Sequence, residues 1–217
     1  LVTVRVIAID GPAGAGKSTV AREVARATEL QYLDTGAMYR CVALSVLRQH
    51  IDPFDEETVG RVARSVSIDV QGVRAFLDGV DVSAEIRTTE ISNTVSIIAA
   101  HTPVRDAMRM QQRQWIETNG GGVVEGRDIG TVVFPDAMLK VFLWASPEVR
   151  ATRRVDQTGD DFDEVVRNIT ERDRIDSTRS DSPLRPADDA VSLDSSSIAV
   201  DDVVAAIVQH FQERDGR

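Results

Sequence analysis

Short runs of apolar residues alternate along the chain with longer amphipathic stretches. The first run, residues 4–9, is continuous, which is typical of a strand buried on both faces of a parallel sheet. Four more strands are predicted over residues 32–33, 123–124, 141–144 and 190–193. The stretches between these runs have helical composition, so the pattern predicts an α/β fold with a five-stranded, mostly parallel sheet.

The amphipathic stretches predict helices, and one segment departs from the pattern. The helices are expected over residues 18–30, 37–49, 91–115, 147–154, 162–174 and 200–211, with a break in the third near Thr102 and Pro103. Between residues 66 and 82, apolar positions alternate with turn residues such as Asp78 and Gly79. This segment is predicted to form a small antiparallel sheet inserted into the α/β core.

A glycine-rich segment follows the first strand and opens the first helix. It reads Gly11-Pro12-Ala13-Gly14-Ala15-Gly16-Lys17-Ser18. Glycines let backbone N–H groups turn toward phosphates, and the helix N-terminus adds a positive dipole. We expect Lys17 to reach the outer phosphates of ATP and the Ser18 hydroxyl to ligate Mg²⁺. The segment therefore predicts a nucleoside triphosphate site, without indicating what accepts the phosphate.

Charge and cysteine content narrow the possible partners and the compartment. The formal net charge of −10 argues against binding to nucleic acid or to an anionic membrane. The chain has one cysteine, Cys41, and an intrachain disulfide is therefore impossible. No apolar run is long enough for a membrane span, and no secretory signal pattern is present. We expect a cytoplasmic protein.

The position of the arginines indicates the phosphate acceptor. Residues 34–40, 125–128 and 171–179 are expected at the carboxyl edge of the sheet, where open α/β folds bind ligands. Each segment carries arginine, whose planar guanidinium binds phosphate in a bidentate manner. An acceptor that itself carries a phosphate is therefore predicted.

Several classes of protein remain open from these residues alone. A regulatory GTPase is disfavoured because the sequence has no Asn-Lys-x-Asp element to read guanine. The alternatives are a kinase for another nucleotide, an alcohol kinase with Asp34 as base, and a nucleotide-gated regulatory protein. A phosphate acceptor is mostly a dianion at neutral pH, so a kinase of this kind needs no general base from the protein. None of the three histidines lies in a motif.

Five motifs, at residues 9–19, 33–40, 81–87, 126–137 and 172–179, resemble the bacterial cytidylate kinase family. This family is a branch of the nucleoside monophosphate kinases within the P-loop NTPase superfamily. The resemblance covers nearly the whole chain and implies a three-layer α/β/α fold, a five-stranded parallel sheet, a short helical lid and an inserted antiparallel sheet. It implies transfer of phosphate from ATP to CMP and dCMP with Mg²⁺. Separately from the resemblance, we expect a monomer whose partners are these small-molecule substrates, with no nucleic acid or membrane among them.

The resemblance also implies a division of the chain and a role for each matched residue. The core would comprise residues 1–50, 96–150 and 171–217, the monophosphate-binding insert residues 51–95, and the lid residues 151–170. The phosphate loop would extend from Gly11 to Thr19, and Mg²⁺ would be held by Ser18, with Thr19 or waters as alternatives. The residues expected to contact the cytosine ring are Thr35, Arg105 and Asp128. Those expected to hold its phosphate are Arg40, Arg127 and Arg179, and those near the sugar are Tyr39, Ser96, Arg172 and Asp176. Catalysis is assigned to Lys17, Arg40, Arg127, Arg154 and Arg179.

Overall fold

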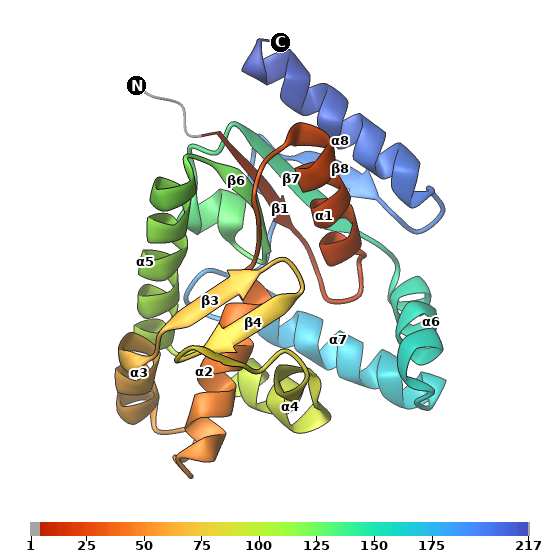
Figure 1. Ribbon diagram of the computed structural model, residues 1–217. Coiled ribbons are helices and arrows are strands. Elements are labelled where there is room, and N and C mark those ends of the chain that lie inside the picture. The colour runs from red at the N-terminus through yellow and green to blue at the C-terminus, as the bar shows by residue number, and fades with distance from the viewer. Residues whose placement is uncertain (1–4, 217) are drawn as a thin grey trace. The chain divides into compact units, whose positions relative to one another are not determined.

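The computed structural model describes residues 5–216, apart from the side chains of residues 157 and 158, and the chain divides into two compact units (Figure 1). The first unit contains the chain up to Tyr32 and again from Asn119 onward, and the second contains residues 33–118. The second unit is therefore one continuous segment between the two parts of the first.

The first unit is built on a parallel sheet with strand order β2-β6-β1-β7-β8. Its strands are β1 (Val6–Asp10), β2 (Tyr32–Asp34, which leads into the second unit), β6 (Gly122–Gly126), β7 (Leu139–Trp144) and β8 (Val191–Asp194). The central strand β1 is buried along its whole length, as its continuous apolar run predicts. All five predicted strands are confirmed, although the predicted start of the first, at residue 4, lies outside the described residues.

Of the four α-helices that the structure describes in the first unit, the first and the last bury their apolar stripes against this sheet. The four are α1 (Lys17–Thr28), α6 (Pro147–Thr158), α7 (Phe162–Thr178) and α8 (Val200–Asp215). Helices α1 and α8 lie against one face of the sheet (Figure 1), where Val20 and Val24 of α1 and Ile207 of α8 join one core cluster with β1. Each such side chain contributes about 1.5–3 kcal/mol through burial. This core fixes α1, and with it the loop that precedes it.

Helices α6 and α7 form a hairpin with its own small core. Ala151, Val165 and Ile169 pack together between the two helices. The Ser146 side chain caps α6 by accepting from the Val149 N–H, and Gly159 ends α6 in the left-handed conformation. The predicted lid, residues 151–170, lies in this hairpin, and its closure over ATP stays a prediction.

The second unit combines helices with a small three-stranded sheet. Its elements are α2 (Thr35–Arg48), α3 (Glu56–Ser65), β3 (Ile68–Gln71), β4 (Arg74–Leu77), β5 (Val80–Asp81), the 3₁₀ turn η1 (Glu85–Arg87), α4 (Thr89–Ile98) and α5 (Thr102–Asn119, whose last residue belongs to the first unit). Strand β4 pairs in antiparallel fashion with β3 and β5, so the predicted antiparallel sheet is confirmed. Together with the parallel sheet, this confirms the predicted fold class.

Helix α3 is absent from the helices that the sequence analysis predicts. Its sequence signals are at its start, where the Asp55 side chain accepts from the Thr58 N–H and two glutamates occupy the first turn. A cap and first-turn acids are typical of a helix N-terminus. The buried residues Val59, Val62 and Ala63 are spaced i, i+3 and i+4, which is a short apolar stripe that the sequence analysis did not use.

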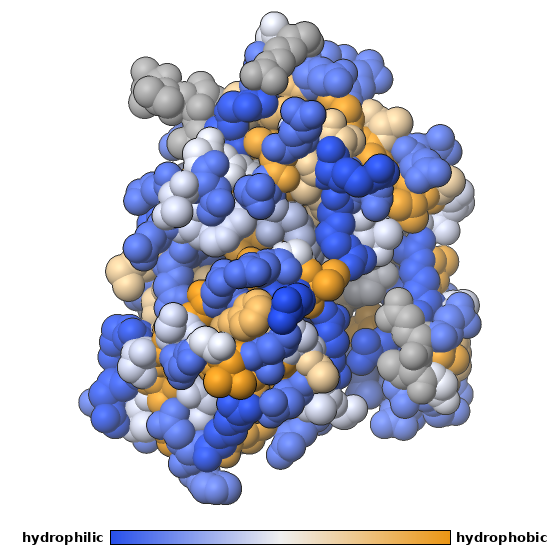
Figure 2. All heavy atoms as spheres, in the orientation of Figure 1, coloured by the Kyte–Doolittle hydropathy of each residue, from blue (hydrophilic) through white to orange (hydrophobic). Residues whose placement is uncertain are grey.

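Apolar residues reach the surface in separate areas of the face drawn in Figure 2, including the area over the small antiparallel sheet. Val73 and Val80, which lie in that part of the chain, are more than half exposed. Such scattered apolar residues are normal for a protein surface. Within residues 5–216, no helix combines the length and the apolar character needed to cross a membrane.

Candidate active site

The glycine-rich segment forms a tight loop between β1 and α1. Gly14 and Gly16 adopt φ values of 78° and 86°, which side chains with a Cβ rarely adopt. A Cβ at Gly11 would overlap the backbone carbonyl oxygen of Leu143 in β7. Only glycine therefore allows the loop to pass this close to the neighbouring strand, and the predicted strand–loop–helix context is present.

Lys17, the first residue of α1, lies buried against the loop. Its Nζ donates to the Pro12 carbonyl oxygen at 2.8 Å. Burial, and then the nearby guanidiniums of Arg127 and Arg172, hold the pKa of Lys17 well below its usual range, although Glu125 and Asp10 oppose this shift. The ammonium thus lies among charged groups from β1, β6 and α7 within the first unit.

Asp10 ends β1 and anchors the turn that follows Arg127 and Asp128. Its carboxylate, which is 4% exposed, accepts from the backbone N–H groups of Ile129 and Gly130 at 2.8 and 2.7 Å. These residues open the π-helical turn Ile129–Val133 (η2). Asp10 lies within the motif at residues 9–19 but is not among the predicted site residues, and its only signal is a charged residue that closes an apolar strand.

Burial raises the pKa of Asp10 to about 6, although the two backbone N–H groups oppose the shift. Between about pH 4 and 6, Asp10 is therefore protonated in the folded protein but ionised in the unfolded chain. Above that range Asp10 is ionised in both states, and its buried charge destabilises the fold. We expect the unfolding free energy of the wild type, relative to Asp10→Asn, to fall as pH rises from 4 to 6, by about 1.4 kcal/mol per pH unit. Denaturant titrations of both proteins at several pH values measure this slope. A constant difference across the window would contradict the assignment.

The end of β6 brings further polar groups into the first unit. The Tyr32 hydroxyl donates to Glu125 Oε1. Glu125 and Asp128 are 4% and 5% exposed. The predicted cytosine-reading residue Asp128 is therefore a buried carboxylate, two residues beyond the end of β6.

A carboxylate from α7 joins two of the predicted phosphate-binding arginines. Arg127 Nε donates to Asp176 Oδ2 at 2.9 Å, and Arg179 Nη1 lies 3.5 Å from Asp176 Oδ1. Burial opposes the ionisation of Asp176, but the guanidiniums of Arg127, Arg172 and Arg179 outweigh it and hold its pKa below the usual value. Arg179 Nε also donates to the Ser182 carbonyl oxygen at 2.7 Å. The guanidiniums are thus held in place by one ionised carboxylate.

The second unit carries the other predicted substrate residues, on α2, α4 and α5. Thr35 is buried at the start of α2, and Arg40 pairs with Asp34 at 3.3 Å. Arg105 is 2% exposed, and its guanidinium carbon lies 5.8 Å from the centre of the Tyr39 ring. Of the predicted residues in this unit, Thr35, Tyr39 and Arg40 thus share the first turns of α2. The remaining one, Ser96 in α4, donates its hydroxyl to the Ser92 carbonyl oxygen at 3.3 Å.

On helix α6, Arg150 donates to the phosphate loop directly, and Arg153 is linked to the loop through Ser195. Arg154, the predicted catalytic residue, is exposed. Arg150 donates to the Ala13 carbonyl oxygen at 3.1 Å. Arg153 donates to the Ser195 carbonyl oxygen at 2.5 Å, and the Ser195 hydroxyl donates to the Ala15 carbonyl oxygen at 2.9 Å. Arg150 and Arg153 have no distinct sequence signal, because three arginines occur within five residues of this helix.

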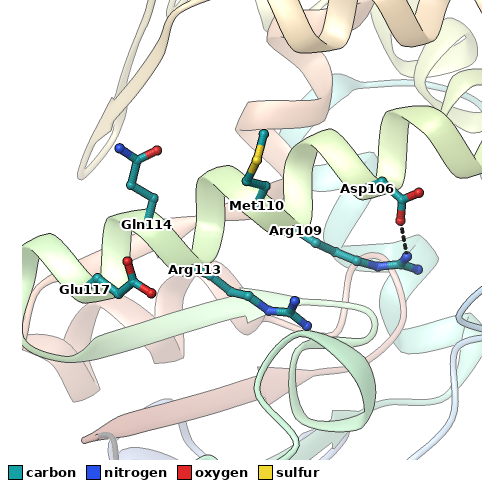
Figure 3. A pocket seen from close by; sticks show the side chains of 6 residues that line it. All are labelled: Asp106, Arg109, Met110, Arg113, Gln114 and Glu117. Atoms are coloured by element: carbon teal, nitrogen blue, oxygen red, sulfur yellow. Dashed lines mark hydrogen bonds and ion pairs between the residues drawn. The ribbon is translucent and has the colours of Figure 1, made fainter.

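A surface hollow of about 490 Å³ lies elsewhere, along α5 (Figure 3). Its lining residues are Asp106, Arg109, Met110, Arg113, Gln114 and Glu117. Arg109 and Asp106 form an ion pair at 2.9 Å. None of the predicted site residues is among the residues that line this hollow.

A family model and individual relatives in sequence comparisons all indicate the same family. A family model for cytidylate kinase matches residues 7–213. A cytidylate kinase from Mycobacterium leprae (strain Br4923) is 49% identical over 216 residues, which cover 97% of each chain. A cytidylate kinase from Pelotomaculum thermopropionicum is 50% identical over 213 residues, which cover 93% of each chain.

Solved structures give a more distant likeness. An uncharacterized protein from Eubacterium ventriosum ATCC 27560 has a TM-score of 0.56 at 13% identity, over 96% of this chain and 99% of its own. A gluconokinase from Sinorhizobium meliloti 1021 has a TM-score of 0.52 at 12% identity, over 99% of this chain and 95% of its own. These likenesses concern the fold alone. The family is shown by the sequences, since the model and the relatives extend over nearly all of the chain: this protein belongs to the cytidylate kinase family.

Proposed function

We propose that this protein transfers the γ-phosphoryl group of ATP to CMP and to dCMP, giving ADP and the nucleoside diphosphate. The observation that carries the proposal lies within the first unit. There, the phosphate loop with Lys17 follows β1, and the Arg127–Asp176–Arg179 group follows the adjacent strand β6 and helix α7. The sequence identity of 49–50% with relatives named cytidylate kinase supports CMP as the acceptor.

On the donor side, residues 11–19 hold the triphosphate of ATP. Their backbone N–H groups and the Lys17 ammonium would bind the phosphates, whose negative charge returns the pKa of Lys17 toward its usual value. Ser18 and Thr19 are exposed on the first turn of α1, so a hydroxyl there is free of the core and fits Mg²⁺, which prefers oxygen ligands and keeps several waters. Bound Mg²⁺ would neutralise charge on the transferring phosphates.

On the acceptor side, arginines align the phosphate of CMP. Arg127 and Arg179, positioned by Asp176, and Arg40 would bind it through planar guanidiniums. Asp128 would accept from the exocyclic amine of cytosine, whereas uracil presents a second acceptor there and is repelled. Thr35 and Arg105 complete the base contacts, while Tyr39, Ser96 and Arg172 lie near the sugar. Arg154, in the lid at residues 151–170, would act on ATP.

An assay of ADP release with a panel of acceptors tests the proposal. The panel contains CMP, dCMP, UMP, AMP and an alcohol such as gluconate. We expect the highest kcat/KM for CMP or dCMP. A higher value for the alcohol would identify an alcohol kinase, and ADP release that no acceptor stimulates would identify a nucleotide-gated protein. Gel filtration checks the further proposal that the chain acts as a monomer, and cell fractionation checks its place in the cytoplasm.

Base selection is predicted to depend on Asp128. The change Asp128→Asn replaces one acceptor oxygen with a donor, which should weaken binding of the cytosine amine and relieve repulsion of uracil. We expect the ratio of kcat/KM for CMP to that for UMP to fall by about tenfold or more, as a lost polar contact of 1–3 kcal/mol implies. Steady-state kinetics with both substrates measure the ratio. The matched control is Asp136→Asn, an exposed aspartate nearby, which should leave the ratio unchanged. Equal losses on both substrates in Asp128→Asn would contradict a role in base selection.

A further inference from the structure

Arg150 is a buried arginine in the first turn of α6, and its partners Ala13, Ala145 and Asp173 all lie in the first unit. It is 3% exposed. Its Nε donates to the Ala145 carbonyl oxygen at 2.9 Å, its Nη1 donates to the Ala13 carbonyl oxygen at 3.1 Å, and its Nη2 lies 2.6 Å from Asp173 Oδ2. One guanidinium thus joins the end of β7, the phosphate loop and helix α7.

The contact with the phosphate loop is close as well as polar. A Cβ at Gly14 would lie 3.1 Å from Arg150 Cβ, so the arginine packs directly against the loop backbone. The backbone of the phosphate loop therefore packs against a side chain whose N–H donors have fixed, coplanar directions. A lysine could not make the three contacts at once, because its ammonium is a single point charge on a flexible stem.

The contact with α7 continues toward the acceptor side. Asp173 lies one helical turn before Asp176, and residues three apart share one face of a helix. Asp176 in turn holds Arg127 and Arg179. The Oδ1 atom of Asp173 is buried and accepts no hydrogen bond, and the carboxylate is paired with Arg150 through its other oxygen, Oδ2.

We infer that Arg150 is a positioning residue that holds the phosphate loop and helix α7 in register, and so aligns the ATP phosphates with the Arg127–Asp176–Arg179 group. This inference rests on the proposed function for its effect on turnover. Its effect on ATP binding does not need any acceptor. Arg150 is not expected to contact the reacting atoms, and its influence passes through Ala13 and Asp173.

The test is chemical rescue of Arg150→Ala. The substitution leaves a space bordered by the Ala13 and Ala145 carbonyl oxygens and the Asp173 carboxylate, which a free guanidinium ion can refill. We expect ATP binding, measured by calorimetry without acceptor, to weaken about tenfold or more, and kcat with CMP to fall by a similar factor or more. Millimolar guanidinium chloride, far below denaturing concentrations, should restore most of both losses. Methylammonium chloride at the same ionic strength should not.

Matched variants separate positioning from general stability. Arg174→Ala removes an arginine of α7 whose ion pair with Glu171 is exposed, so it should keep wild-type ATP affinity and kcat and show no response to guanidinium. Asp173→Asn keeps the shape of its side chain and should lower ATP affinity and kcat in the same direction as Arg150→Ala, by a smaller factor. In the double variant Arg150→Ala/Asp173→Asn, the two losses should not add, and guanidinium should rescue less.

Several outcomes would overturn the inference. One is an ATP affinity of Arg150→Ala equal to that of the wild type. Another is a loss of ATP affinity and kcat in the folded variant that guanidinium does not reverse. If Arg150→Ala does not fold, the decision passes to Asp173→Asn, for which wild-type ATP affinity and kcat would count against the inference. If the wild type fails to phosphorylate CMP, the proposed function fails, while the ATP-binding measurements still decide the role of Arg150.

Discussion

Replacing Lys17 with methionine is expected to lower kcat for CMP by about 10³-fold or more, because the change removes a positive charge directed at the transferring phosphate. Methionine keeps an unbranched stem of similar length in this buried position. Removing an ammonium whose burial opposes its charge should leave the fold intact, so the thermal unfolding midpoint should not fall. Steady-state kinetics and thermal unfolding of the same preparation check both expectations.

The chain offers one matched control, since Lys140 is the other lysine in the sequence. Lys140 Nζ binds both oxygens of the exposed Asp189, at 2.9 and 3.0 Å. Ion pairs of this kind contribute at most about 1 kcal/mol to stability. Lys140→Met should therefore leave kcat within a few-fold of wild type. A comparable kcat for Lys17→Met and Lys140→Met would contradict the assignment of the phosphate loop.

The second large effect is expected for Arg127→Lys, although the charge is conserved. Arg127 uses Nε to bind Asp176 and Nη1 to donate to the Gly126 carbonyl oxygen at 3.3 Å, which leaves Nη2 of its fork to face a phosphate. Lysine cannot bind the carboxylate and a phosphate in this planar geometry. We expect kcat/KM for CMP to fall by about 10²-fold, comparable to the loss of one preorganised donor to a developing charge. The Kd of ATP alone should change much less.

Arg5 provides the control for the arginine-to-lysine change itself. Its guanidinium also binds a carboxylate, with Nε and Nη2 donating to the two oxygens of Asp215 at 3.0 and 2.9 Å. Arg5 directly precedes β1, at the opposite end of this strand from the phosphate loop. Arg5→Lys should therefore affect stability and leave kcat/KM near the wild-type value. Loss of activity in both variants alike would show that the effect at Arg127 is not specific to the site.

The parallel sheet and the phosphate loop could be predicted because their signals are local. A strand buried on both faces needs a continuous apolar run, and β1 has one. The phosphate loop needs glycine where no Cβ fits, as the contact of Gly11 with the Leu143 carbonyl oxygen illustrates. In both cases, a requirement of the backbone constrains the residue type directly.

Groups whose role depends on distant partners could not be predicted from the sequence. Asp10 holds backbone N–H groups of residues 129 and 130, and nothing near Asp10 in the sequence indicates that turn. Arg150, Arg153 and Arg154 share one face of α6, at spacings i, i+3 and i+4. The sequence therefore does not say which of them faces the phosphate loop, because the exact rotation of α6 about its axis selects among them. The packing of α6 on α7, through Ala151, Val165 and Ile169, decides this rotation.

The order in which the chain is synthesised interacts with the position of β1 in its sheet. Strand β1 is made first, but both of its neighbours, β6 and β7, begin only at Gly122 and Leu139. The small sheet and helices of residues 33–118 make many of their contacts with one another and lie in one continuous segment. On a ribosome, this second unit is therefore expected to fold while β1 still has no strand to pair with. The nucleotide-binding loop would then form late, because the most non-local pairings of the chain must close around β1 before α1 and its loop can pack.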